Sequence, residues 1–159
     1  MKLITLSGEG TLTLGLMLIK NAEGFSEVPY KDSLGNWTIG YGFDMATSEF
    51  SNLTEITETQ ADAILKQKIV RILSTKIKGM TLYDYGTKTT NAVLLDMCYN
   101  LGVEGLSSFD TFLTYIMQGK NEEAVADLTN TLWYSQVKER AVRNCLNILL
   151  KNESYLYLI

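Results

Sequence analysis

Two carboxyl groups and a hydroxyl group lie near one another in the N-terminal part of the chain. Glu23 ends a helical pattern, Asp32 follows in a segment typical of a β-hairpin, and Thr38 comes shortly after it. Cleavage of a glycosidic bond needs one carboxylic acid to protonate the leaving oxygen and one carboxylate to direct water or stabilise the sugar cation. These three residues therefore indicate glycoside cleavage, provided that the fold brings them together.

The residues around Gly35 predict a hairpin. A three-residue loop, 34–36, would pair Asp32 with Thr38, and Gly35 would supply the positive φ that short loops need. Beyond the loop, alternation predicts a core face made of Trp37, Ile39, Tyr41 and Phe43. The opposite face would hold Thr38, Gly40 and Gly42, with little side-chain bulk, so we expect a ligand to approach the backbone there. The alternative is an ordinary hairpin whose glycines mark bulges.

The composition limits the possible chemistry. The chain has 159 residues, 46% hydrophobic and 20% charged, with a net charge of −4, which is typical of one globular domain and gives no sign of a nucleic-acid interface. It contains no histidine, which excludes Ser-His-Asp and Cys-His systems and most zinc sites. Carboxylates remain as the acid–base groups. Cys98 and Cys145 lie in apolar helical patterns and are expected to be buried free thiols.

The apolar segment 3–19 is interpreted as part of the folded protein. Glu9, with serine, threonine and glycine around it, interrupts the segment, and no cleavage site stands apart from the helix that follows. We therefore expect no clear signal peptide and no stable membrane insertion.

Helical patterns account for most of the remaining chain. One helix is expected from about Leu12 to Glu23, and a capping box of Thr57 and Gln60 opens a long helix to about Lys78. Residues 89–101 are apolar nearly all round, which predicts a central buried helix ended by glycines 102 and 105. The last helix should bury a stripe made of Val142, Cys145, Leu146, Leu149 and Leu150.

These elements predict one α+β domain, 1–159, with two lobes. The β-rich lobe is 24–56, the linking helix is 57–78, and the helical lobe combines 79–159 with 12–23. A cleft between the lobes would place Glu23 and Asp32 on opposite walls.

Three motifs resemble those of the phage-type lysozymes, or endolysins, of glycoside hydrolase family 24: Glu23-Gly24, Tyr30-Lys31-Asp32 and Thr38-Ile39-Gly40-Tyr41-Gly42. The second half is also similar, through the segments 97–102 and 133–136 and the pair Arg140 and Arg143. The resemblance spans roughly residues 12–150 and implies a lysozyme-like α+β fold.

The resemblance also implies roles for individual residues. Glu23 corresponds to the general acid, Asp32 to the carboxylate that acts on the attacking water, and Thr38 to the hydroxyl that helps to place this water. Arg140 corresponds to an arginine that pairs with the acid. Four further residues correspond to polar groups lining the cleft (Asn100 and Gln136) and to the sugar-binding rim (Tyr99 and Asp127). Simpler alternatives are core packing for Tyr99 and a solvated helix charge for Arg140.

The function implied is that of a muramidase that hydrolyses the β-1,4 bond between N-acetylmuramic acid and N-acetylglucosamine in bacterial peptidoglycan. We expect no cofactor, no metal and no nucleic-acid partner, and a monomer that reaches the wall after release from the host cytoplasm. A lytic transglycosylase and a non-catalytic peptidoglycan-binding domain are the alternatives.

Two further expectations concern a rival for the catalytic acid and the overall charge of the chain. Glu27 is a rival acid, but Pro29 disfavours helix at the preceding residue and places Glu27 in a loop. The net charge of −4 predicts weak long-range attraction to an anionic wall. A local basic patch is the exception to consider, made of Lys138, Arg140, Arg143 and Lys151.

Overall fold

The computed structural model describes residues 1–150 and 153–159. In this part of the chain the helices are α1 (Thr11–Glu23), α2 (Glu58–Ser74), α3 (Lys88–Ser107), α4 (Asp110–Met117), α5 (Asn121–Thr129), α6 (Leu132–Val137) and α7 (Glu139–Leu149). The strands are β1 (Lys2–Thr5), β2 (Ser26–Lys31), β3 (Trp37–Gly40), β4 (Phe43–Asp44), β5 (Lys76–Ile77), β6 (Met80–Thr81) and β7 (Tyr155–Leu158). Lys151, one member of the basic patch considered above, lies outside the described residues.

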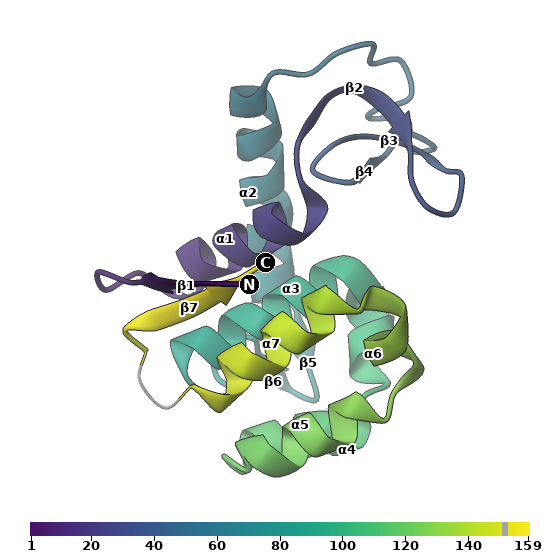
Figure 1. Ribbon diagram of the computed structural model, residues 1–159. Coiled ribbons are helices and arrows are strands. Elements are labelled where there is room, and N and C mark those ends of the chain that lie inside the picture. The colour runs from purple at the N-terminus through teal and green to yellow at the C-terminus, as the bar shows by residue number, and fades with distance from the viewer. Residues whose placement is uncertain (151–152) are drawn as a thin grey trace.

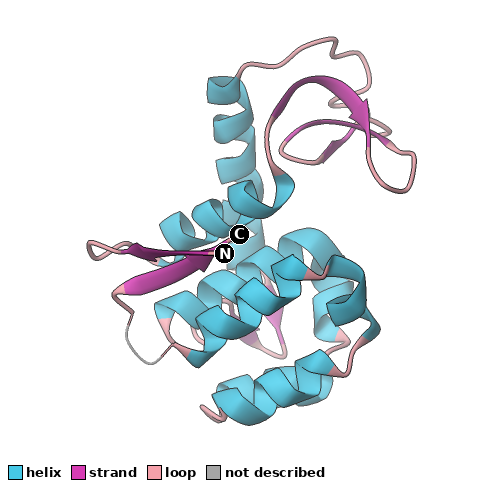
Figure 2. Cartoon of the chain, viewed as in Figure 1, coloured by secondary structure: helices cyan, strands magenta, loops and turns pink. Residues whose placement is uncertain are grey.

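The elements form a small β lobe and a larger helical lobe, so the predicted α+β, lysozyme-like fold is confirmed. Antiparallel strands β2, β3 and β4 make the small lobe, in the order β2-β3-β4. Helices α3 to α7 make the large lobe, and α2 runs from one lobe to the other (Figures 1 and 2). Helix α1 lies on the large lobe, and its last residue faces the small one.

Helix α2 begins where the sequence predicted and ends earlier. The Thr57 hydroxyl accepts a hydrogen bond from the Gln60 amide at 3.2 Å, and the Gln60 side chain accepts one from the Thr57 amide at 2.9 Å, which completes the capping box. The helix ends at Ser74, not near Lys78, because the chain turns there into the short pair β5–β6. Lys20 of α1 pairs with Asp62 of α2 at 2.6 Å and so links these two helices.

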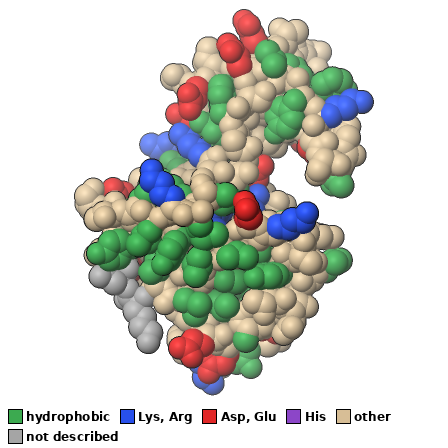
Figure 3. Space-filling view, viewed as in Figure 1, with side chains coloured by type: hydrophobic (Ala, Val, Ile, Leu, Met, Phe, Trp, Pro, Cys, Tyr) green, Lys and Arg blue, Asp and Glu red, His purple; other side chains and the backbone are tan. Residues whose placement is uncertain are grey.

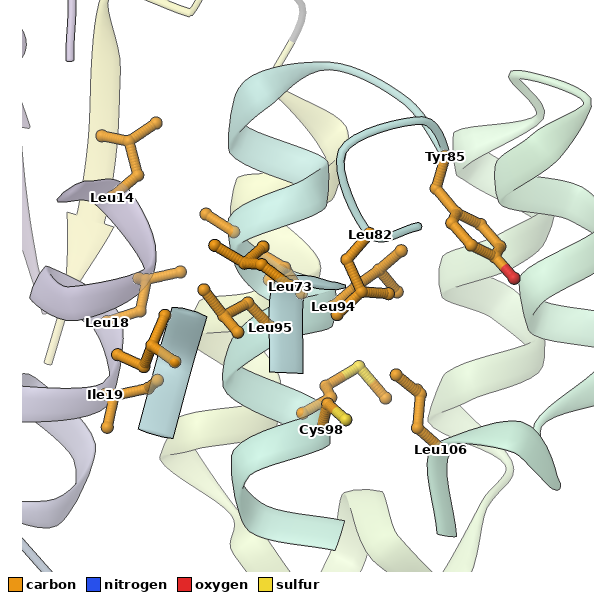
Figure 4. Close-up of a cluster of buried hydrophobic side chains, with 14 of the residues drawn as sticks. Leu14, Leu18, Ile19, Leu73, Leu82, Tyr85, Leu94, Leu95, Cys98 and Leu106 are labelled. Atoms are coloured by element: carbon orange, nitrogen blue, oxygen red, sulfur yellow. The ribbon is translucent and has the colours of Figure 1, made fainter. Parts of the chain in front are cut away.

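Helix α3 is the centre of the core, as predicted. Residues 89–98 are all buried, and Figure 4 shows Leu18 of α1 and Leu73 of α2 beside Leu95. The helix does not end at Gly102, because a φ of 77° there makes a kink and the chain then continues helically to Ser107. Cys98 and Cys145 are buried free thiols, as expected, and burial raises the pKa of each to about 11.

Helix α7 buries a different face from the predicted one. Val142 and Leu149 are exposed, whereas the buried face includes four polar residues, Arg140, Arg143, Asn144 and Asn147. The predicted stripe is therefore wrong at Val142 and Leu149. The reason is a set of partners on α1, α3 and β7 that satisfy these polar groups, which hydrophobic periodicity does not register.

The first and last strands close the large lobe. Strands β1 and β7 pair antiparallel, with Lys2 opposite Leu158, and Figure 1 shows both chain ends beside α1. The Asn21 side chain of α1 accepts a hydrogen bond from the Ile159 amide at 2.8 Å. Among the described residues, no helix has both the length and the apolar character required to cross a bilayer.

Candidate active site

Glu23 is the last residue of α1 and lies at the junction of the two lobes. Gly24 ends the helix with a φ of 66°, and its amide donates to the Lys20 carbonyl at 3.0 Å. The chain then turns directly into β2, so that the glutamate side chain is left at the edge of the large lobe with 21% of its surface exposed. A carboxyl group in this place is partly shielded from water and still reachable by a ligand.

Arg140 holds one oxygen of this carboxylate. Its Nη1 donates to Glu23 Oε1 at 2.8 Å, so the ion pair that the resemblance implied is present. Arg140 is 8% exposed, which rules out a solvated helix charge. Its Nε and Nη2 donate to Oδ2 and Oδ1 of Asp96 at 3.0 and 2.8 Å, a bidentate contact that fixes the guanidinium plane.

Asp96 was not among the predicted site residues. Its side chain is fully buried on α3, and it also accepts hydrogen bonds from Arg143 Nη2 and Asn144 Nδ2, each at 2.8 Å. Burial opposes ionisation of Asp96, but the charge of Arg140 and these hydrogen bonds outweigh it, so its pKa lies below the ordinary value. The signal that could have found it is a lone acid inside the apolar run 93–98, which requires a buried partner.

A cavity of about 260 Å³ opens beside the acid, lined by Glu23, Gly24, Phe25, Ser26 and Tyr30. Figure 3 shows the molecular surface hollowed between the small and large lobes, with charged side chains on the walls of the hollow. Burial raises the pKa of Tyr30, and the negative charges of Glu23 and Asp32 add to the effect. Tyr30 therefore lies within electrostatic reach of both carboxylates.

A larger cavity, of about 790 Å³, lies elsewhere, at the start of α3 around Thr87 and Lys88. The acid on its wall, Glu153, already accepts a hydrogen bond from the Lys88 amide. Size alone therefore does not identify the site, and the smaller cavity is the candidate because Glu23 lines it.

The hairpin register differs from the predicted one. Lys31 pairs with Trp37 and Tyr30 with Thr38, so Asp32 does not face Thr38 and belongs to the loop. The cause is the Asp32 carboxylate, whose Oδ1 accepts hydrogen bonds from the amides of Leu34 and Asn36, both at 2.9 Å, and so closes a longer loop. Gly35 has the expected positive φ, 84°.

These loop contacts keep Asp32 ionised. The amide of Asn36 makes the largest contribution and, with the amide of Leu34, lowers the pKa of Asp32 below its ordinary value of 3.8. A carboxylate of this kind can orient a water molecule by accepting its hydrogen bond, and it has no proton of its own to give at neutral pH.

The two predicted faces of the hairpin are only partly correct. Ile39, Tyr41 and Phe43 are buried, but Trp37 is 54% exposed because β3 begins at the edge of the lobe, beside the loop. The glycine face is also occupied. A Cβ atom at Gly40 would meet the Phe43 ring at 2.7 Å, and one at Gly42 would meet Glu23 Oε2 at 2.7 Å. The lack of bulk at Gly42 therefore makes room for the acid.

Thr38 is buried, and its hydroxyl donates to the Asn36 carbonyl at 3.1 Å. It therefore shares Asn36 with Asp32, which links the two predicted catalytic residues through one loop residue. Glu27 lies outside α1, as expected, but in strand β2, with an exposed side chain.

The four remaining predicted residues lie on the large lobe. Asn100 Oδ1 accepts a hydrogen bond from Trp133 Nε1 at 2.8 Å, and the Tyr99 hydroxyl donates to the Tyr41 carbonyl at 2.6 Å. Tyr99 thus joins α3 to the small lobe, and burial raises its pKa, as does the charge of Glu23. Among the described residues, the side chains of Gln136 on α6 and Asp127 on α5 form no hydrogen bond or ion pair with the other predicted site residues.

Comparison with known proteins identifies the family of the chain. The phage lysozyme family model matches residues 20–147. The chain is 29% identical to an endolysin of Acyrthosiphon pisum secondary endosymbiont phage 1, over 86% of this chain and 88% of the relative. It is 26% identical to a probable T4-type lysozyme 2 of Dictyostelium discoideum, over 79% of this chain and 88% of the relative.

A third relative is much longer than the chain. This is the pre-baseplate central spike protein Gp5 of Enterobacteria phage T4, which is 27% identical over 87% of this chain and only 28% of its own length. The family match covers the acid, the hairpin, the central helix and most of α7. The chain belongs to the phage lysozyme family.

Proposed function

We propose that the chain is a peptidoglycan hydrolase of the lysozyme type that cleaves the β-1,4 bond between N-acetylmuramic acid and N-acetylglucosamine. The observation that carries the proposal is the placement of Glu23 at the junction of the lobes, with Oε1 held by Arg140 and Oε2 beside Gly42. Family membership and the endolysin relative support a substrate in the bacterial wall.

In this proposal Glu23 is the general acid. Because Arg140 occupies Oε1, the proton is carried on Oε2, the oxygen that lies at the glycine turn of the small lobe. Transfer of this proton to the glycosidic oxygen allows the bond to the anomeric carbon to break without expulsion of an alkoxide. The sugar that carries the glycosidic oxygen is released with this oxygen as a hydroxyl group.

Asp32 and Thr38 would act on the water. An ionised Asp32 accepts a hydrogen bond from a water molecule and takes its proton as the oxygen attacks the anomeric carbon, while Thr38 helps to place that water. A water between carboxylate and sugar implies inversion at the anomeric carbon and a separation of roughly 6.5–9.5 Å between the two carboxyl groups. Proton nuclear magnetic resonance of the first product tests this, because inversion gives the α-anomer.

The other predicted residues would support this centre. Asn100 and Trp133, through their hydrogen bond, would shape the wall of the cleft below the acid, and Gln136 would line the same wall. Tyr99 and Asp127 would contact sugar rings at the rim. We also propose that the protein acts as a monomer and reaches the wall after release from the host cytoplasm.

The decisive experiment identifies the sugar ends that the protein makes from purified peptidoglycan, by mass spectrometry. The proposal predicts reducing N-acetylmuramic acid ends. Reducing N-acetylglucosamine ends would show cleavage of the other glycosidic bond, and 1,6-anhydro ends would show a lytic transglycosylase, which needs no water-directing carboxylate. Sedimentation with the wall and no released fragments would show a binding domain.

A further inference from the structure

We propose that Asp96 is a positioning residue for the catalytic acid: it holds the Arg140 guanidinium in the orientation that presents Nη1 to Glu23 and balances the charge of that arginine. This inference rests on the proposed function, because it assigns a role within the same site. Asp96 itself does not touch the substrate, since its side chain is fully buried.

The orientation follows from the hydrogen bonds. Arg140 makes its bidentate contact to Asp96 through Nε and Nη2, and the Asp96 carbonyl accepts a further bond from Nη2 at 3.3 Å. Because the guanidinium is planar, the contact that fixes Nε and Nη2 also fixes the direction of Nη1, which points toward Glu23 Oε1. The position of the acid is thus set from α3, through α7.

The charge argument is independent of the orientation. An arginine with one carboxylate partner would strongly favour ionised Glu23, the form that cannot donate a proton. In this protein Arg140 is shared between Glu23 and a second, buried carboxylate. Asp96 therefore reduces the penalty for protonating Glu23 while the hydrogen bond that orients it is kept.

Other charged and titratable groups face this centre from every neighbouring element. Arg143 of α7 pairs with Asp96, and its Nη1 is bonded to the Leu18 carbonyl at 2.8 Å. The charge of Glu23 raises the pKa of Tyr30 of β2 and of Tyr99 of α3, and the charge of Asp32 also raises the pKa of Tyr30. From α2, Asp62 is paired with Lys20. Of these groups, Asp96 is the acid that shares Arg140 with Glu23.

The test compares three variants on purified peptidoglycan, with activity measured per folded molecule against pH. Asp96→Asn keeps the shape and removes the charge, so we expect the alkaline limb of kcat/KM to move to lower pH by about one unit, the size typical of a neighbouring charge. Asp96→Glu keeps the charge and displaces the guanidinium, so we expect an unmoved limb and a kcat lowered about 10-fold or more at unchanged KM.

Arg143→Gln is the matched control. It disrupts the same buried cluster without contact to Glu23, so a purely structural role predicts the same pH profile for this variant and for Asp96→Asn. We expect its alkaline limb to stay or to move to higher pH, because a cation is removed. If Asp96→Asn does not fold, a comparison of kcat and of the alkaline limb between Asp96→Glu and Arg143→Gln still tests the role of Asp96.

The outcomes separate the two proposals. An active wild-type enzyme with the same alkaline limb in Asp96→Asn, or equal kcat in Asp96→Glu, overturns the role of Asp96 and leaves the proposed function intact. A wild-type protein that releases no muropeptides overturns the proposed function, and this inference with it.

Discussion

Oε2 of Glu23 lies against the backbone of Gly42, so closely that a Cβ atom at Gly42 would be 2.7 Å from it. The φ of Gly42, 75°, is also one that other residues adopt at a cost. Gly42→Ala should therefore displace the acid, and we expect kcat to fall about 100-fold, the loss typical of a misplaced catalytic group. Lysis of purified walls measures this loss.

Gly35→Ala provides a control for backbone strain. Gly35 has a φ of 84°, and a Cβ atom there would meet nothing within 4 Å. Both variants should lose about 1–2 kcal/mol of stability, but only Gly42→Ala should lose most of its activity. Equal activity in the two variants would show that Oε2 is not the oxygen that reacts.

The assignment of the acid predicts a large effect at one glutamate and a small effect at another. Glu23→Gln keeps the size of the side chain and removes the proton donor, so activity should fall by about 10² to 10⁴-fold. Glu27→Gln is the control, because Glu27 lies on β2 with an exposed side chain. Reversed results would transfer the acid role to Glu27.

Asp32 predicts the acid limb of the pH profile. Because hydrogen bonds from the Asn36 and Leu34 amides lower its pKa, Asp32 is still mostly ionised at pH 3.8, the pKa of an ordinary aspartate. Its contribution to stability is present above the unfolded-state pKa and is lost as the pH falls through the lower, folded value. We expect the limb of kcat/KM that reports Asp32 to lie below pH 3.8.

Asn36→Ala tests the smaller, side-chain contribution to the lowered pKa of Asp32. It removes the side-chain hydrogen bond from Asn36 Nδ2 to Asp32 Oδ2, 3.4 Å long, and should move the acid limb to higher pH. Leu34→Ala changes an exposed side chain in the same loop and should not move it. An acid limb at the same pH in Asn36→Ala and wild type would argue that another group titrates there.

Local signals in the sequence were sufficient for the helix that carries Glu23 and for the start of α2. The capping box of Thr57 and Gln60 depends on two side chains three residues apart, and the start of α2 is as predicted. The hairpin register was not predictable in the same way. A symmetric loop about Gly35 competes with the hydrogen bonds of the Asp32 carboxylate, and the carboxylate determines the pairing.

The support of the acid depends on contacts between residues far apart in sequence. Periodicity identifies apolar stripes, and it placed Val142 in the buried stripe of the last helix, whereas the structure exposes Val142 and buries Arg143. Arg143 is buried because its hydrogen-bond donors are satisfied by α1 and α3, and Asp96 is buried for the complementary reason. Such a cluster follows from the tertiary arrangement and not from any one helix.

The burial of Arg140 and Arg143 argues against the basic patch considered near the C-terminus. A basic patch near the C-terminus requires exposed cations, but these two arginines are 8% and 0% exposed and are paired with acids. Of the four residues considered, Lys138 is exposed and Lys151 lies outside the described part of the chain. We therefore expect the net charge of −4 to govern the approach to an anionic wall.

We expect the initial rate of wall lysis to stay flat or to rise slightly from low to moderate ionic strength. The Debye length falls from about 30 Å at 0.01 M to about 10 Å at 0.1 M salt, which screens the repulsion between protein and wall. An enzyme steered by positive charge would instead lose rate. The measurement uses purified walls at fixed pH, with an uncharged chitin oligosaccharide as control substrate. A steep fall on walls alone, with the circular dichroism spectrum unchanged, would show that a basic surface governs the encounter.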